Sequence, residues 1–179
     1  MYATLLDEQE GEPAVYPAPA PYQRLQTGLP EEDGEVEPAA VWQRLEAWTR
    51  RRWPSRSVTW TVSGRGEFRP PLEPFTLASV ERWANGAWIA ETPPASPLGW
   101  SLDDAVYRIA GTAGDDSAPP EAVVEAFRRL HEYARGVSLQ FADSAADYAG
   151  DTHRRPAGWA ARGIHLSGAA DLLRPWRRL

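Results

Sequence analysis

The hydrophobic period of the chain changes within residues 38–63, PAAVWQRLEAWTRRRWPSRSVTWTVS. In the first part, Val41, Leu45 and Trp48 have the spacing of one face of a helix. A proline opens this run and another follows it, and proline suits a first helical turn but cannot continue a helix. These residues predict a helix over 38–53.

The residues that follow alternate apolar and hydroxyl side chains, with Val58, Trp60 and Val62 on one face. A period of two is typical of a half-buried strand. Farther along, Asn85-Gly86 lies between two strand-like runs, and this dipeptide supplies the positive φ angles of a tight hairpin turn. We therefore expect an antiparallel β-meander over residues 57–110.

The second half of the chain predicts more helix. Val123 and Phe127 recur at helical spacing and indicate a helix over 119–135, followed by a loop over 136–155 and a helix over 157–166. This order of elements predicts an α+β fold. We expect a mainly helical core of about three helices, an inserted β-meander or hairpin, and extended N- and C-terminal arms.

The two ends of the chain carry opposite charge. Residues 1–37 contain nine acidic residues, one arginine and five prolines, and we interpret them as an acidic, proline-rich arm. Residues 151–179 contain two acidic residues and six arginines. Two ends of opposite charge are expected to contact different surfaces, or to contact each other in neighbouring subunits. The expected organisation is the arm, a connector domain over 38–166 and a C-terminal docking arm over 167–179.

The last residues, SGAADLLRPWRRL, combine a short apolar turn with aromatic and basic groups. Trp and Arg are over-represented at the centres of protein interfaces, whereas a chain end is normally polar and poorly ordered. We predict that this end docks into another protein, and the alternative is a tail folded back on its own core. The predicted docking residues are Leu172, Leu173, Arg174, Pro175, Trp176, Arg177 and Arg178.

The composition excludes several kinds of chemistry. The chain has 179 residues with no cysteine and no lysine, so disulfides, thiol nucleophiles and Schiff-base lysines are excluded. A net charge of −6 disfavours nonspecific DNA binding. The sequence shows no signal-peptide pattern and no membrane-spanning apolar run, which predicts a cytosolic location or a particle assembled in the cytosol.

The titratable residues form no convincing catalytic pattern. The three histidines, His131, His153 and His165, lack metal-ligand spacing. The acidic pairs Asp103-Asp104 and Asp115-Asp116 have a chemistry that suits a metal, but their places beside turns favour backbone capping. We expect no enzymatic activity, no cofactor and no metal. A metal-dependent hydrolase that uses one of these pairs is the least favoured alternative.

Nine tryptophans are the other unusual feature of the composition. Trp83 and Trp88 flank the Asn85-Gly86 turn and are predicted to pair across the hairpin, with a possible contact to another subunit or a tail component. Exposed aromatic side chains on a β-surface also bind sugars. A tryptophan-rich carbohydrate- or peptide-binding module, with Trp83, Trp88 and Trp100 as its platform, is therefore the second hypothesis.

The order of segments from Val41 to Leu179 resembles the head–tail connector (adaptor) proteins of long-tailed bacteriophages and of the related gene-transfer agents. The end of the chain, with its small residues, leucine pair, proline, aromatic residue and arginines, matches the family position by position. Residues 1–37 depart from the family, whose members usually begin with a short helix. The other segments that carry the resemblance are 41–53, 58–62, 70–97, 106–111 and 119–130.

The resemblance implies a structural component of a virion or phage-like particle, located at the head–tail junction and assembled in the bacterial cytoplasm. It implies a ring of copies, commonly a dodecamer, through whose lumen DNA passes without specific binding. The helices would form the ring wall, from which the β-part projects. The C-terminal arm would insert into the portal protein, and the opposite face would receive the stopper or head-completion protein.

Overall fold

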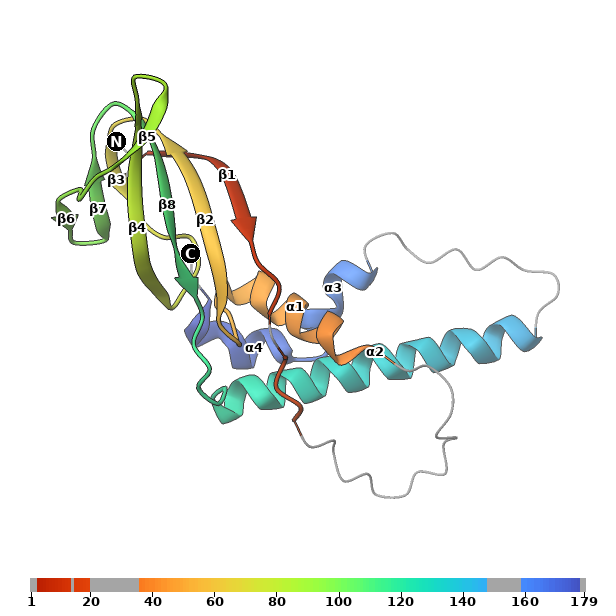
Figure 1. Ribbon diagram of the computed structural model, residues 1–179. Helices are drawn as coiled ribbons and strands as arrows, with labels where there is room; N and C mark the ends of the chain where they lie inside the picture. The colour runs from red at the N-terminus through yellow and green to blue at the C-terminus, as the bar shows by residue number, and fades with distance from the viewer. Residues whose placement is uncertain (1–2, 14, 20–35, 148–158, 178–179) are drawn as a thin grey trace. The chain divides into compact units, whose positions relative to one another are not determined.

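The computed structural model describes residues 3–13, 15–19, 36–147 and 159–177 (Figure 1). The chain forms two compact units, a β-unit of residues 1–15 and 50–117 and a helical unit of residues 16–49 and 118–179. This division differs from the single connector domain expected over 38–166. The reason is that the N-terminal segment adds a strand to the β-unit, while the first helix belongs to the other unit.

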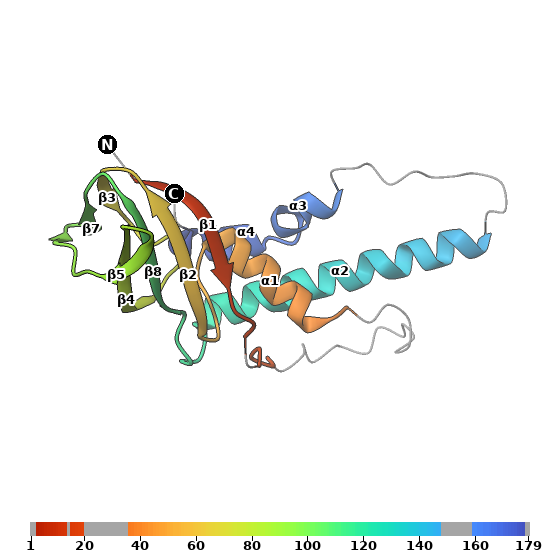
Figure 2. The same cartoon turned by 45° about the horizontal axis from the view of Figure 1, so that its top comes forward.

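The β-unit is built on a five-stranded antiparallel sheet with the strand order β1-β2-β8-β4-β5 (Figure 2). A second sheet has the order β3-β7-β6. The strands of the larger sheet are β1 (Thr4–Glu10), β2 (Arg56–Ser63), β8 (Val106–Ala113), β4 (Phe75–Ala84) and β5 (Ala87–Ala90). Those of the smaller sheet are β3 (Gly66–Phe68), β7 (Gly99–Leu102) and β6 (Ala95–Ser96).

One face of the larger sheet is buried, as the alternation in β2 predicts. Val58, Trp60 and Val62 are inaccessible to solvent, and the register places Trp60 opposite Ile109 and Val62 opposite Tyr107 of β8. The hydroxyl residues between them lie on the other face. The same core also contains the buried side chains of Phe68, Leu72, Val80, Leu102 and Ala113.

The N-terminal segment contains a strand, which corrects the expectation of an irregular arm over residues 1–37. Strand β1 pairs with β2 from Thr4 opposite Ser63 to Glu10 opposite Val58. The acidic composition of this N-terminal segment does not predict a strand. The arginines that neutralise Glu10 lie far along the chain, in the segment that precedes β2 and in β2 itself, so no local pattern revealed them.

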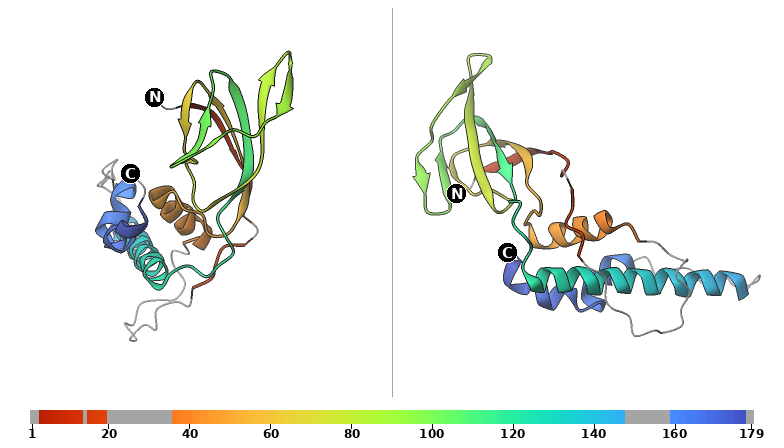
Figure 3. Two further views of the ribbon diagram at one scale, coloured as in Figure 1. Left: turned by 90° about the vertical axis from the view of Figure 1, so that its left-hand side faces the viewer. Right: turned by 60° about the horizontal axis from the view of Figure 1, so that its bottom comes forward.

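Within its described residues, the helical unit contains four helices and a final 3-10 turn (Figure 3). Two bounds differ from the prediction by more than two residues. The first helix ends at Thr49 because Arg50 has a φ of 60°, in the left-handed region that stops a helix. The long helix continues through much of the expected loop, since residues 137–147 contain neither glycine nor proline. The elements are α1 (Pro38–Thr49), α2 (Glu121–Asp147), α3 (Trp159–Leu166), α4 (Ala169–Leu173) and η1 (Arg174–Trp176).

The apolar faces of α1 and α2 pack on each other. Trp42 stacks on Phe127 with 4.9 Å between the ring centroids, and Leu45 and Val123 are fully buried. The indole N–H of Trp42 donates a hydrogen bond of 2.8 Å to the carbonyl oxygen of Pro17, which satisfies its buried polar group. The helix faces predicted from the apolar spacing therefore form the core of this unit.

The α+β class is confirmed, although the description as mainly helical understates the strands. Among the described residues, the strands contain 46 residues, and the helices with the 3-10 turn contain 55. Strands β2, β4 and β8 each have eight residues or more, and β1 adds a strand that the sequence did not predict. In the part of the chain that the structure describes, no helix is both long enough and apolar enough to cross a membrane.

Candidate docking surfaces

The described docking residues lie at the end of the helical unit, in α4, in η1 and, for Arg177, directly after η1. Leu173 is fully buried, and α4 packs against α2 and α3. Leu172 and Trp176 are half-buried, whereas Arg174, Pro175 and Arg177 are exposed. Arg178 lies outside the described residues. The segment therefore divides into a buried anchor and an exposed end.

Arg177 lies against α1 of its own unit. Its guanidinium is 4.4 Å from the centroid of the Trp48 ring, and His165 of α3 meets the same ring edge-on at 4.8 Å. A cation over a tryptophan face contributes roughly 0.5–1 kcal/mol at an exposed site. The described part of the tail is thus ordered on its own unit and presents Arg174 and Pro175 outward. Docking to another protein stays a prediction.

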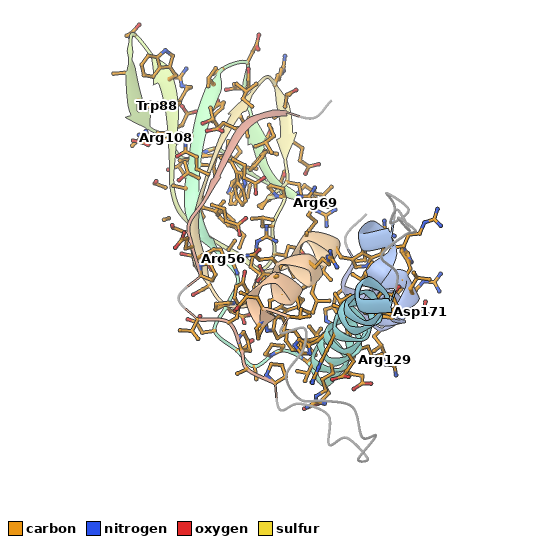
Figure 4. All side chains as sticks on the ribbon, turned by 90° about the vertical axis from the view of Figure 1, so that its right-hand side faces the viewer. Arg56, Arg69, Trp88, Arg108, Arg129 and Asp171 are labelled. Carbon is orange, nitrogen blue, oxygen red and sulfur yellow. The ribbon has the colours of Figure 1, made fainter. Side chains whose placement is uncertain are left out.

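The turn between α3 and α4 sets the direction of the chain end. Gly168 has a φ of 74°, which glycine adopts without the steric cost of a side chain. The hydroxyl of Ser167 accepts a hydrogen bond of 3.3 Å from the N–H of Ala169 at the start of α4. Figure 4 shows Asp171 on α4 and Arg129 on α2, and the Arg129 guanidinium lies beside Gly168.

The predicted tryptophan pair is present in the β4–β5 hairpin. Trp83 lies opposite Trp88, with ring centroids 5.2 Å apart and ring planes inclined by 65°. The turn residues Asn85 and Gly86 have φ angles of 52° and 79°, as a tight primed turn requires. The cross-strand pairing is confirmed, whereas a contact with another subunit or a tail component stays a prediction.

The tryptophans do not form the flat platform that a sugar ring needs. The Arg108 guanidinium lies 4.7 Å from the centroid of the Trp88 ring and also pairs with Glu81 at 2.6 Å (Figure 4). Trp100 lies in the smaller sheet and meets the ring of Phe75 edge-on at 6.1 Å. One ring is covered, the hairpin pair is steeply inclined, and the third ring packs elsewhere. This geometry argues against the carbohydrate-binding hypothesis.

The side chains of Asp115 and Asp116 make the contacts of loop caps. Asp116 accepts hydrogen bonds from the backbone N–H and the hydroxyl of Ser55 at 3.2 and 2.9 Å, and Asp115 accepts them from the backbone N–H and hydroxyl of Ser117. The N–H of Asp103 donates to the phenol oxygen of Tyr107 at 3.3 Å. Among the described residues, no three metal-ligating side chains gather into a group that could hold a metal ion.

The histidines have different surroundings. A ring nitrogen of His131 is 3.3 Å from the carbonyl oxygen of Val36, and the ring stacks on Phe127. His165 contacts Trp48, as described above, and His153 lies outside the described residues. The two described histidines therefore pack against aromatic side chains of the helical unit.

Comparison with solved structures finds this fold in chains of particle necks. A chain of the "Neck of empty GTA particle computed with C6 symmetry" aligns with a TM-score of 0.53 and 17% identity, over 97% of this chain and 96% of that chain. A chain of the "Virion of native gene transfer agent (GTA) particle" aligns with a TM-score of 0.50 and 18% identity, over 87% and 85%. No protein-family model and no curated protein sequence matches the chain. The chain therefore shares its fold with chains of gene-transfer-agent particles.

Proposed function

We propose that the protein is a head–tail adaptor, a structural and non-enzymatic component of a gene-transfer-agent or phage-like particle. The observation that carries the proposal is the alignment with a neck chain over 97% of the sequence. Because this alignment spans both units, the likeness is not limited to a common pair of helices. The order of segments in the sequence supports the same function.

In this proposal the copies form a ring, expected to be a dodecamer, at the head–tail junction, and they assemble in the bacterial cytoplasm. The portal protein binds one side of the ring and the stopper binds the other. The aligned neck was computed with C6 symmetry, which suits a cyclic assembly. DNA passes through the lumen, and the net charge of −6 disfavours tight binding of its phosphates.

The C-terminal end is the part that we propose docks on the portal. The buried Leu173 fixes α4 to its own unit, so the segment that follows leaves from a defined place. Arg174 supplies an exposed planar cation and Trp176 a half-buried aromatic ring. Guanidinium groups form paired hydrogen bonds with carboxylates, and tryptophan supplies a large apolar contact. We therefore expect acidic and apolar residues at the matching site on the portal.

The variant Arg174→Glu tests this docking without touching the buried anchor. We expect it to fold normally and to bind the portal of the same genome about tenfold more weakly or worse, since it reverses a charge at the contact. Arg162→Glu makes the same charge change at an exposed residue of α3 and should bind as the wild type does. If both variants bind the portal equally well, Arg174 is not part of the docking surface.

A further inference from the structure

The larger sheet of the β-unit has two unpaired edges. Among the described residues, β1 pairs only with β2 at one edge, and β5 pairs only with β4 at the other. Figure 1 shows these two strands on opposite sides of the sheet. An unpaired edge presents backbone N–H and C=O groups that can add a strand of another chain.

The β5 edge is neutral and apolar. All four residues of β5 are uncharged, and its Ile89 is 46% exposed. Edge strands that stay unpaired are usually blunted by charges, prolines, bulges or a very short length, and β5, with four residues, has only the last of these. The N–H of Glu91 donates to the carbonyl of Val80, so in the alternating ladder Trp88 and Ala90 direct their backbone groups outward.

The β1 edge carries acidic residues and a register irregularity between Leu5 and Asp7, but the residues near its start are apolar. Leu5 and Leu6 are 40% and 57% exposed. Leu5 lies opposite the buried Val62, which places its side chain on the core-side face of the sheet. Ile89 lies opposite Arg82, two residues from the buried Val80, so it is on the same face of the sheet as Leu5.

We propose that in the ring the β5 edge of each copy pairs with the β1 edge of the next copy, so that the larger sheets of neighbouring subunits become continuous. This inference rests on the proposed adaptor function. A contact between two different edges of the same chain is head-to-tail, and such contacts form a cyclic ring when the rotation from one copy to the next closes. It satisfies both edges of every copy and places Ile89 against Leu5.

The negative charge of β1 favours pairing of β1 with β5 over pairing of two β1 strands. Asp7 and Glu8 lie in the middle of β1, and two β1 strands side by side would bring these carboxylates together. The β5 edge adds no negative charge of its own to the contact. A second copy of this chain therefore supplies a compatible edge, and β1 discourages its own self-pairing.

Engineered cysteines test the contact without competing disulfides from native cysteines of this chain, because the chain has no cysteine. Leu5→Cys and Ile89→Cys are placed in the same chain. Three strands separate β1 from β5, which is about 19 Å at the usual strand spacing, whereas the Cα atoms of a disulfide lie at most about 7 Å apart. Any disulfide between these positions must therefore join two copies. We expect oxidation of the portal-bound ring to give a ladder of covalent oligomers.

The matched control combines Leu5→Cys with Leu98→Cys. Leu98 is as exposed as Ile89, at 46%, but it lies between β6 and β7 of the smaller sheet, so no ladder is expected. The pair Glu8→Cys and Ile89→Cys tests the neighbouring register of β1 against β5, with both cysteines on the same face of the sheet. The variant Ala90→Pro removes an outward N–H of β5 and should reduce ring assembly by about five- to tenfold at limiting concentration.

The outcomes separate this inference from the proposed function. A ladder from either β1–β5 pair and none from the control supports continuous sheets in the ring. A ring that forms on the portal without cross-links from either pair, and that tolerates Ala90→Pro, overturns the inference and leaves the adaptor function standing. A wild-type protein that forms no ring with the portal overturns both.

Discussion

Glu10 connects the N-terminal strand to the rest of the β-unit through two arginines. Its carboxylate accepts hydrogen bonds from Arg52 at 2.5 and 2.7 Å and from Arg56 at 3.0 Å, and the Arg56 side chain is only 5% exposed. Partial burial of Glu10 raises its pKa, but the hydrogen bonds and charges of Arg52 and Arg56 outweigh burial and lower the pKa from its ordinary value of 4.5. Removing this carboxylate leaves two arginines with fewer acceptors in a largely buried site.

We predict that Glu10→Gln lowers the free energy of unfolding by about 1–3 kcal/mol, because it weakens hydrogen bonds to charged groups. In the wild type, the folded pKa lies below the unfolded value, so this contribution is fully present above pH 4.5 and is lost as the pH falls through the folded pKa. Denaturant titrations at several pH values should show that, as the pH falls below 4.5, the free energy of unfolding decreases less in Glu10→Gln than in the wild type. Glu12→Gln, at an exposed site, is the control, and equal stability of the two variants would contradict the role of Glu10.

Leu173 is the residue that anchors the C-terminal segment. We predict that Leu173→Ala lowers the free energy of unfolding by about 2–4 kcal/mol, because it leaves a cavity at a fully buried position. Leu166→Ala, at a position that is 58% exposed, should change it by about 0.5 kcal/mol or less. Thermal unfolding monitored by circular dichroism measures both. Similar losses would show that α4 is not held by this side chain.

At the scale of secondary-structure elements, the pairing of β4 with β8 depends on a glycine. A Cβ at Gly111 would lie 2.3 Å from the carbonyl oxygen of Thr76 and 2.5 Å from the ring of Phe75. Both neighbours belong to β4, and the oxygen is backbone, so the two strands would have to move apart. Gly86 differs, since nothing lies within 4 Å of its Cβ position and only its φ of 79° resists a side chain.

We therefore predict that Gly111→Ala destabilises the β-unit by about 3 kcal/mol, through overpacking between strands. Gly86→Ala should cost only about 1–2 kcal/mol, through backbone strain in the hairpin turn. Chemical denaturation of the two variants measures the difference. The reverse order would mean that the β4–β8 contact is looser than the structure shows.

The elements that the sequence predicted well are those with short-range signals. The spacing of Val41 and Leu45, the alternation around Trp60 and the Asn85-Gly86 turn each depend on residues close together in the chain. Strand β1 was missed because its stabilising partners are distant in sequence. The tryptophan pair was predicted from the turn between its members, whereas the burial of Leu173 and the contact of Arg177 with Trp48 depend on helices that no local pattern brings together.

At the scale of the whole molecule, neither unit is formed by one continuous piece of chain. The β-unit takes residues 1–15 and 50–117, and the helical unit takes residues 16–49 and 118–179. Residues early in the chain therefore contribute to both units. The likeness to a neck chain covers 97% of the sequence and therefore includes both units.

The most direct test of the adaptor function is the mass of the full-length protein, measured by light scattering after size-exclusion chromatography, alone and mixed with the portal of the same genome. We predict either a ring of the protein alone or a monomer that becomes a stoichiometric ring on the portal. A protein that stays monomeric and elutes separately from the portal would contradict the adaptor function.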